Sequence, residues 1–372
     1  MQSIGTLHGR KRTYQVEPHE LLPTTDMVGI ELELEGEFDH EHVNGWDIHG
    51  DGSLRDGVEY VFAGPAGGAS AVRRLENMAR FIRQNEVAPT FRCSTHIHLD
   101  VGDLDAEQLK RLVMTYALFE DVMFDHCDLS RRFSNFCTPY FNNNTLVERA
   151  SRYLHDFCHT EKRTAQFEAF PKYSAFNLQP IIRLDTVEFR GSGALTTLDE
   201  LIGLTQRMLH LKRTVREVGA ADSTEYLHTI NALHPRDVFQ TGLRDNYVRD
   251  QELADICYSN ALQICNYVGR ENNIGFRPND NWVGAFDEFH GQPIPQPRPR
   301  GDQRDTFIVR DYNEQALHRI GLMVPNDRSW KTARKVIRAI NGMVGANINP
   351  LDVVLLENPE IEQNIFNDYI RN

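Results

Sequence analysis

The stretch Val28-Gly-Ile-Glu-Leu-Glu-Leu-Glu35 predicts the strand around which the rest of the chain is organised. Side chains two residues apart in a strand point to the same face, so this strand has one apolar and one acidic face. The apolar face carries Ile30, Leu32 and Leu34, and the acidic face carries Glu31, Glu33 and Glu35. An ordinary solvated face is the simplest explanation. Glutamate is a poor strand former, however, and a hard cation such as Mg²⁺ between the carboxylates would relieve their repulsion.

Three more segments alternate in the same way and carry polar groups on one face. They are Val58–Phe62 with Glu59, Thr95–Val101 with His96 and His98, and Leu184–Arg190 with Glu188 and Arg190. Two imidazoles on one face of an apolar strand favour a role as ligands or phosphate contacts. Arginine is a natural phosphate clamp, although a cross-strand salt bridge would also explain Glu188 and Arg190.

Helical spacing predicts helices between these strands. We expect them over 71–85, 105–126, from Thr197 onward, over 250–268 and over 329–340, and we expect the proline-rich segment 293–299 to be a surface loop. Asp105 with Gln108 and Thr197 with Glu200 resemble capping boxes. The expected fold class is therefore α+β, a curved and mainly antiparallel sheet with its acidic residues on the concave face and helices packed behind.

Composition excludes several classes of protein. The 372 residues carry a net charge of −13, which argues against nucleic-acid binding. No apolar run is long enough for a membrane span and the N-terminus does not resemble a signal peptide, so we expect a cytoplasmic protein without membrane contact. The six cysteines form no CxxC pair, which argues against a disulfide scaffold or a zinc site. GxxxxGK[ST] is absent, so any ATP would have to bind on the predicted sheet.

Taken together, the ordered motifs resemble the putative amidoligase family, which is similar to glutamate–cysteine ligases and more distantly to glutamine synthetases. The matching motifs are Gly29-Ile-Glu31-Leu-Glu33, Trp46 to Asp51-Gly-Ser-Leu54, Val58-Glu59-Tyr-Val, Cys93-Ser-Thr-His96-Ile-His98, Tyr173 to Asn177, and Thr186-Val-Glu188-Phe-Arg190. The stretch from Arg131 to Pro139 also resembles this family, and the likeness covers roughly residues 27–215. Each motif is weak alone, and the order is what makes the set specific.

The resemblance implies a role for each of these residues. The sheet would be of the glutamine synthetase catalytic type, and the metal ligands would be Glu31, Glu33, Glu59, His96 and Glu188. His96 and Glu188 would complete the metal site nearer the ATP phosphates, and Glu59 would join Glu33 near the substrate carboxylate. Arg190 and Glu59 would be catalytic, while His98, Asn177 and Arg190 would contact the cofactor. Two departures are Arg92-Cys-Ser-Thr95 in place of a glycine-rich stretch and the lack of a clear further partner for Glu33, for which Asp51 is a candidate.

The implied function is an ATP-dependent carboxylate–amine ligase that forms an acyl phosphate and releases ADP and phosphate. It would use two or more Mg²⁺ ions, or Mn²⁺, and take its acid and amine from amino acids, peptides or protein side chains. Residues 1–26 would be an irregular leader, 27–215 the catalytic core and 216–372 a mostly helical region that could complete the acceptor site. The alternatives are a phosphotransferase, an amide hydrolase or a catalytically silent structural or binding protein.

Overall fold

The structure is a computed structural model that describes residues 2–267, apart from short segments, and three later strands. The segments left out are 11–13, 37, 39–40, 52–53, 55–56, 86, 88–89, 91–92, 126, 128–130, 132–135, 160–163 and 240–248. Contacts divide the chain into two units, one of residues 1–132 with 136–276 and one of 133–135 with 277–372. The loop expected over 293–299 and the helix expected over 329–340 lie outside the described residues.

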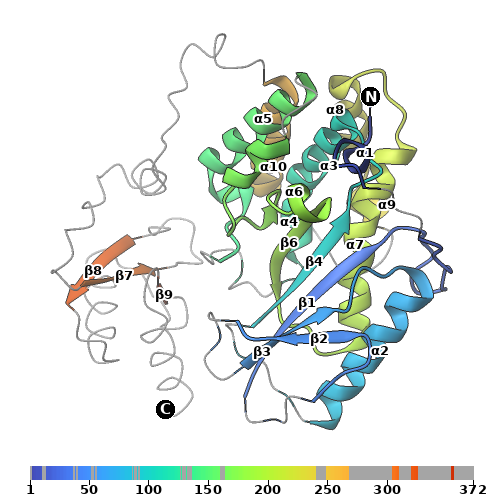
Figure 1. Cartoon of the computed structure of the whole chain (residues 1–372). Helices are drawn as coiled ribbons and strands as arrows, with labels where there is room; N and C mark the ends of the chain where they lie inside the picture. Colours follow the sequence, from blue (N-terminus) through green and yellow to red (C-terminus); the bar gives the residue numbers. More distant parts are fainter. Residues whose placement is uncertain are drawn as a thin grey trace. The chain divides into compact units, whose positions relative to one another are not determined.

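The first unit is built on a six-stranded antiparallel sheet (Figure 1). In spatial order its strands are β2 (Trp46–His49), β3 (Gly57–Phe62), β1 (Val28–Glu35), β4 (Ser94–Asp100), β6 (Thr186–Gly193) and β5 (Phe176–Asn177). The strand predicted from the opening motif is β1, and it lies between β3 and β4. The antiparallel α+β architecture is confirmed, and the glutamine synthetase type of the sheet stays a prediction.

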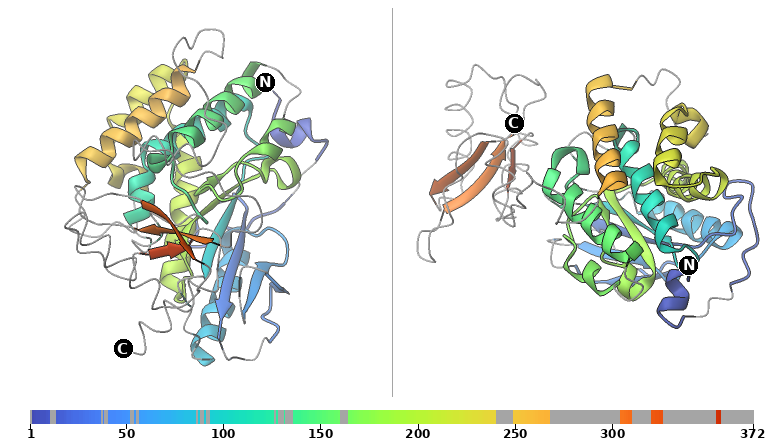
Figure 2. Two further views of the ribbon diagram at one scale, coloured as in Figure 1. Left: turned by 90° about the vertical axis from the view of Figure 1, so that its left-hand side faces the viewer. Right: turned by 90° about the horizontal axis from the view of Figure 1, so that it is seen from above.

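Helices flank this sheet, as the views in Figure 2 show. The longer ones are α2 (Gly68–Gln84), α3 (Ala106–Leu118), α4 (Glu120–Asp125), α5 (Asn144–His159), α7 (Leu198–Glu217), α8 (Ser223–Asn231), α9 (Pro235–Phe239) and α10 (Gln251–Asn266). Capping boxes begin both α3 at Asp105 and α7 at Thr197, as predicted. No described helix has both the length and the apolar character needed to cross a bilayer.

The core lies between the helices and the apolar face of the sheet. Ile30, Leu32 and Leu34 of β1 are completely buried, and α7 contacts β4 while α2 and α3 pack against α7. The inward-facing residues of the neighbouring strands join the same cluster: Val58, Tyr60, Phe62, Ile97, Leu99, Val187 and Phe189. Because side chains alternate along a strand, burying this face directs the glutamates of β1 to the other face.

The helix predicted over 105–126 is two helices. α3 ends at Leu118, and α4 begins at Glu120 after Phe119, whose φ of −115° departs from helical geometry. The carboxylate of Glu120 then accepts hydrogen bonds from the backbone N–H groups of Tyr140 and Phe141, at 2.8 and 2.7 Å. These partners lie about twenty residues away, so the helical periodicity could not reveal the break.

The strand predicted over 184–190 is displaced along the chain. Leu184 ends the one-turn helix α6 (Ile181–Leu184), Asp185 adopts a left-handed φ of 53°, and β6 runs from Thr186 to Gly193. Asp185 is completely buried and is bound by His8 and by Arg10, the latter at 2.8 Å. The N-terminal segment therefore holds the turn in place.

Two further segments complete the description. The N-terminal segment contains the one-turn helix α1 (Ile4–Leu7). Among the described residues there are also two short 3₁₀ helices, η2 (Tyr140–Asn142) and η3 (Thr164–Ala169). In the second unit β8 (Ile320–Pro325), β7 (Arg304–Val309) and β9 (Val353–Leu355) form an antiparallel sheet. Helices α8–α10 lie at the start of the region predicted to be mostly helical, whereas β7, β8 and β9 were not predicted. For residues 216–372 as a whole, the mostly helical character stays a prediction.

Candidate metal centre

Strand register brings the predicted polar residues together on one face of the sheet. The β1–β4 pairing sets Glu31 opposite His96, and the β1–β3 pairing sets Glu33 opposite Glu59. On the other side of β4, Glu188 of β6 lies opposite His98. Five side chains from four neighbouring strands, namely Glu31, Glu33, Glu59, His96 and Glu188, thus form what we call the acidic centre.

A β-bulge adjusts the sheet at this point. Between Thr95 and Ile97 of β4 the register shifts, so that Arg190 and Gly191 of β6 together oppose His96. A Cβ atom at Gly191 would lie 2.6 Å from the ring of Phe189, which is too close for any side chain. Bulges redirect side chains and are common beside active sites. Arg190 lies at this bulge, two residues after Glu188, and therefore shares the face of the acidic centre.

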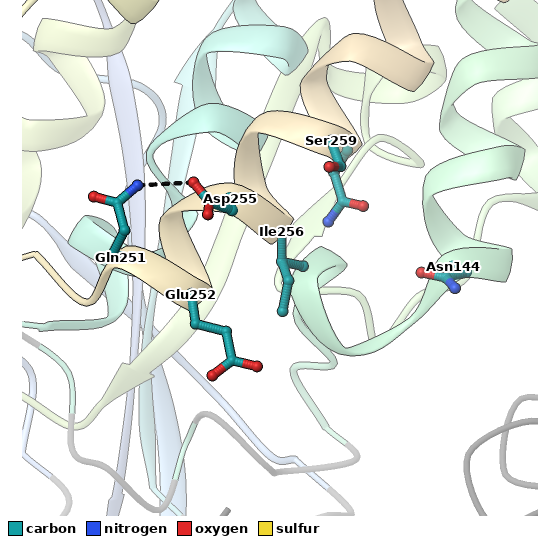
Figure 3. A pocket seen from close by; sticks show the side chains of 7 residues that line it. Asn144, Gln251, Glu252, Asp255, Ile256 and Ser259 are labelled. Carbon is teal, nitrogen blue, oxygen red and sulfur yellow. Dashed lines mark hydrogen bonds between the residues drawn. The ribbon is translucent and has the colours of Figure 1, made fainter.

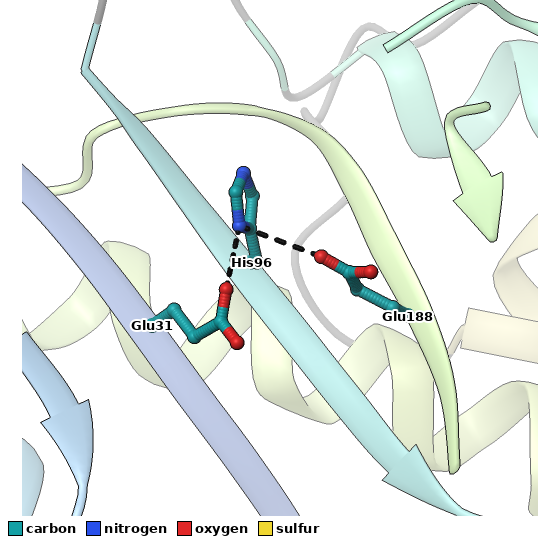
Figure 4. A group of neighbouring side chains, drawn as sticks. All are labelled: Glu31, His96 and Glu188. Atoms are coloured by element: carbon teal, nitrogen blue, oxygen red, sulfur yellow. Dashed lines mark hydrogen bonds and ion pairs between the residues drawn. The ribbon is translucent and has the colours of Figure 1, made fainter. Parts of the chain in front are cut away.

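The first ligand group consists of Glu31, His96 and Glu188 (Figure 4). Nδ1 of His96 lies 2.9 Å from Oε2 of Glu31 and 3.5 Å from Oε1 of Glu188. One ligand atom from each residue lies within 4.8 Å of the others. Three strands contribute one side chain each, so the backbone of the sheet fixes the spacing of the group.

The second ligand group consists of Glu33, Glu59 and His96, again with one atom from each residue within 4.8 Å of the others. The Ser94 hydroxyl joins two of its members, because it donates to Oε2 of Glu33 and lies 2.7 Å from Nε2 of His96. A neutral imidazole offers one lone pair, so His96 can serve only one of the two groups as a ligand.

Neighbouring side chains fix the orientation of the ligands. The Asn177 amide donates to Oε2 of Glu188 at 2.8 Å, and its oxygen accepts from the backbone N–H of Gln179 at 2.9 Å. His98 lies 2.9 Å from Glu31 through Nε2 and 3.1 Å from the Thr186 hydroxyl through Nδ1. Such outer contacts hold metal ligands in one orientation. The cofactor contacts expected of Asn177 and His98 stay predictions.

Charges on the β4–β6 side of the centre are well compensated. Burial opposes the charge of Glu31, but hydrogen bonds from His96 and His98 prevail and hold the pKa of this carboxyl well below its ordinary value. Burial also opposes the charge of Glu188, whose pKa is lowered by the Arg190 guanidinium in direct contact with it. Both carboxylates are therefore ionised at neutral pH.

Charges on the β1–β3 side are not compensated. Burial and the neighbouring charges of Glu31, Glu33 and Asp51 raise the pKa of Glu59 to about 8. Among the described residues no cationic side chain forms an ion pair with Glu33 or Glu59. Asp51, the candidate further partner of Glu33, is close enough to act on Glu59.

The donor set fits a hard divalent cation. Carboxylate oxygens dominate both groups, and oxygen-rich sites prefer Mg²⁺ or Mn²⁺ over softer metals. Burial and the neighbouring carboxylates raise the pKa of Glu59, and a cation bound there would favour the ionised carboxyl. The two ligand groups share His96, so one of two bound ions would be held without this imidazole.

A separate hollow of about 600 Å³ lies beside α10 (Figure 3). Its lining is polar but carries no member of the acidic centre: Asn144, Gln251, Glu252, Asp255, Ile256, Ser259 and Asn260. Glu252 and Asp255 are exposed and do not form a metal-ligand group with any described residue. Among the described residues, the groups able to bind a metal therefore lie on the sheet and not at this hollow.

The structure brings together every site residue expected from the sequence, and it adds two that the sequence analysis did not select. Ser94 and Thr186 carry no charge and occur in ordinary strand positions, so nothing in their type marked them. Their places two residues before His96 and Glu188 were the available signal, because residues two apart share a strand face. Arg131 was noted only as part of a motif.

One comparison with known families bears on this centre. Residues 65–202 match the family model described as "Putative amidoligase enzyme", and no curated protein matches the chain. The matched segment contains His96, His98, Asn177, Glu188 and Arg190, whereas the glutamates of β1 and β3 precede it. The description indicates an amide-bond-forming ligase and confirms the resemblance inferred from the motifs. Residues 65–202 are therefore similar to the family described as putative amidoligase enzymes.

Proposed function

We propose that this protein is an ATP- and Mg²⁺-dependent carboxylate–amine ligase that acts through an acyl phosphate. The observation that supports this best is the convergence of Glu31, Glu33, Glu59, His96 and Glu188 with Arg190 on one face of the sheet. The family match of residues 65–202 supports the formation of an amide bond. Neither observation identifies the acid or the amine, which we expect to be amino acids, peptides or protein side chains.

The reaction requires two anions to approach each other. A carboxylate is a poor electrophile, so its oxygen first attacks the γ-phosphorus of ATP, ADP leaves, and an acyl phosphate results. Both reactants carry negative charge, and catalysis of phosphoryl transfer depends mainly on positioning and electrostatic stabilisation. A site for this step must therefore present cations to the two reactants.

Different residues of the site would have different roles in this step. Mg²⁺ bound by the two ligand groups would supply the positive charge that draws the phosphates and the carboxylate together. Arg190, held by Glu188, would stabilise the charge that develops on the transferred phosphoryl group. Asn177 and His98 would keep Glu188 and Glu31 in orientation, through contacts of 2.8 and 2.9 Å.

The second step forms the amide. The amine attacks the acyl carbon, phosphate leaves with the oxygen that joined carbon to phosphorus, and the nitrogen loses a proton. Glu59 is the partly exposed carboxylate of the second ligand group and can accept this proton once ionised. The products are one amide, ADP and inorganic phosphate.

The proposal is tested by incubating the full chain with ATP, Mg²⁺ and pools of amino acids and peptides, and searching by mass spectrometry for products lighter by one water than the sum of two substrates. We expect such a product together with ADP in equal amount. A Glu188→Gln variant serves as the inactive control, because Glu188 contacts both His96 and Arg190.

Other outcomes would replace the proposal with a different function. Cleavage of amides without ATP would indicate a hydrolase. ADP with a stable phosphorylated product would indicate a phosphotransferase, and AMP in place of ADP would exclude an acyl phosphate. No turnover and no Mg²⁺-dependent nucleotide binding would indicate a structural or binding protein.

A further inference from the structure

Arg131 is a buried cation next to Arg190. The reaction proposed above assigns no role to it. Its side chain is 5% exposed, and Nη2 donates a 3.0 Å hydrogen bond to the backbone carbonyl of Arg190, the one hydrogen bond of this side chain among the described residues. Nε of Arg131 is buried and has no hydrogen-bond partner. No described carboxylate forms an ion pair with this guanidinium.

The position of Arg131 is defined by the edge of β6. The short strand β5 pairs with β6 only at Glu188 and Phe189, and the N–H of Arg190 donates to Ala175 at 2.8 Å. The carbonyl of Arg190 points toward the same edge as its N–H, which is where Arg131 binds it. The backbone of Arg131 is held in turn, because the buried Cys137 thiol donates to its carbonyl at 3.4 Å.

A purely structural role would not explain the charge. A neutral donor could satisfy the carbonyl of Arg190 equally well, without the cost of taking a guanidinium out of water. Buried charges in proteins are normally paired, and Arg131 differs in this from Arg190, whose charge is matched by Glu188. Nε of Arg190 is also buried without a partner, so each guanidinium retains an unused donor.

We propose that Arg131 is a second anion-binding residue of the site and that it binds an oxyanion of a substrate, either a phosphoryl group or a carboxylate. The inference rests on the proposed ligase, in which two anions must be held side by side. Arg190 already contacts Glu188, whereas Nε of Arg131 has no hydrogen-bond partner and could donate to an incoming oxyanion. The Arg131 guanidinium is bonded to the backbone carbonyl of Arg190, which places the two arginines next to each other along the edge of β6.

The test compares charge with hydrogen bonding at position 131. Arg131→Gln keeps an N–H donor for the carbonyl of Arg190 and removes the charge, whereas Arg131→Lys keeps the charge. Arg111→Gln is the comparison variant, because Arg111 on α3 also donates to a backbone carbonyl, that of Ala220 at 3.3 Å, but pairs with Glu107 and contacts no member of the acidic centre among the described residues. Calorimetry at constant ionic strength measures the affinity for inorganic phosphate, for a non-hydrolysable ATP analogue with Mg²⁺, and for glutarate.

We expect Arg131→Gln to weaken at least one of these probes by about 10- to 100-fold, the usual effect of losing a charge-assisted hydrogen bond, with a smaller loss in Arg131→Lys. A loss for phosphate and the ATP analogue assigns Arg131 to the phosphoryl group, and a loss for glutarate assigns it to the acid. Without ligand, Arg131→Gln should melt at the temperature of the wild type or higher, because an unpaired buried charge is removed.

Unchanged affinity for all three probes in a folded Arg131→Gln protein would overturn the inference and leave Arg131 a structural residue. Should Arg131→Gln fail to fold, the affinities of Arg131→Lys are measured in its place. Only an anion-binding role predicts that Arg131→Lys binds a probe more weakly than the wild type does. The proposed function fails separately. Suppose that the wild-type protein makes no amide but binds phosphate, and that Arg131→Gln weakens this binding. The anion site would then be supported and the proposed ligase would not.

Discussion

Two groups of charged side chains are attached to the same sheet, and they differ in how their charges are balanced. The first, which we call the ion-pair clamp, consists of Asp26, Asp103, Lys212 and Arg216. Lys212 is 1% exposed and lies 2.8 Å from Asp26 and 2.6 Å from Asp103, and Arg216 contacts the same two carboxylates. Two cations thus meet two anions, and α7 is tied to the segments before β1 and after β4.

The acidic centre has no such balance. It gathers four carboxylates around His96, and the nearby Arg190 is already engaged with Glu188. The consequence appears at Glu59, whose pKa is raised to about 8, whereas the pKa of Asp103 in the clamp is lowered, burial being outweighed by Lys212 and Arg216. A balanced group stabilises the fold, whereas a group with excess negative charge is suited to binding a cation.

The largest effect is expected from removing one charge of the acidic centre. Glu31→Gln keeps the shape of the side chain but removes the negative charge that His96 and His98 contact at 2.9 Å. We expect about a 10³-fold lower kcat and one fewer bound Mg²⁺, with the fold retained. The exposed residue Glu76 offers a control variant, Glu76→Gln. Unchanged Mg²⁺-dependent nucleotide binding in the calorimeter would show that Glu31 is not a ligand.

Breaking the ion-pair clamp should lower the free energy of unfolding and leave kcat nearly unchanged. Lys212→Met removes the buried cation and leaves Asp26 with Arg216 as its ion-pair partner, so we expect a loss of up to about 3 kcal/mol, the lower end for a broken buried pair. Urea unfolding should show this loss, while the kcat of the protein that remains folded changes less than about twofold. A Lys212→Met protein as stable as the wild type would mean that the clamp is not structural.

A smaller effect on catalysis is expected at Arg190. Arg190→Lys keeps the positive charge beside Glu188 but loses the planar fork that can bind two oxygens. We expect kcat to fall by about 10²-fold with a smaller change in KM for ATP, because the contact forms with the transition state. Steady-state kinetics with varied ATP separates the two parameters. The reverse pattern would assign Arg190 to ground-state binding.

The smallest effect concerns pH. A carboxyl group with a pKa of about 8 is protonated below that pH, and a proton there competes with a cation. Mg²⁺ affinity should therefore fall by up to about tenfold per unit as the pH drops from 8 to 6. Glu59→Gln should bind Mg²⁺ weakly and with a flatter pH dependence. Calorimetry at three pH values checks this, and equal wild-type affinity at pH 6 and 8 would exclude Glu59 as a ligand.

The sequence predicted the faces of the strands better than their ends. Alternation from Ile30 to Glu35 correctly placed the glutamates opposite the core, because one strand face must be buried. Pairing register, such as Glu33 opposite Glu59, comes from contacts between distant segments, and no local pattern encodes it.

The remaining differences have the same origin. The left-handed turn at Asp185 is held by His8 and Arg10, more than 170 residues away. Arg131 is recognisable as unusual only once its burial and its lack of a counter-ion are known. Uncharged Ser94 became visible as part of the site only through its contacts with Glu33 and His96.

The most direct test of the account follows one oxygen atom. If the cations of the acidic centre bring the carboxylate to the γ-phosphoryl group of ATP, a substrate labelled with ¹⁸O in its carboxylate must pass one label to inorganic phosphate for each amide formed. Mass spectrometry of the phosphate measures this transfer. We predict one ¹⁸O per phosphate, and we predict that Glu31→Gln abolishes it together with the amide. Amide product accompanied by unlabelled phosphate would contradict the central claim.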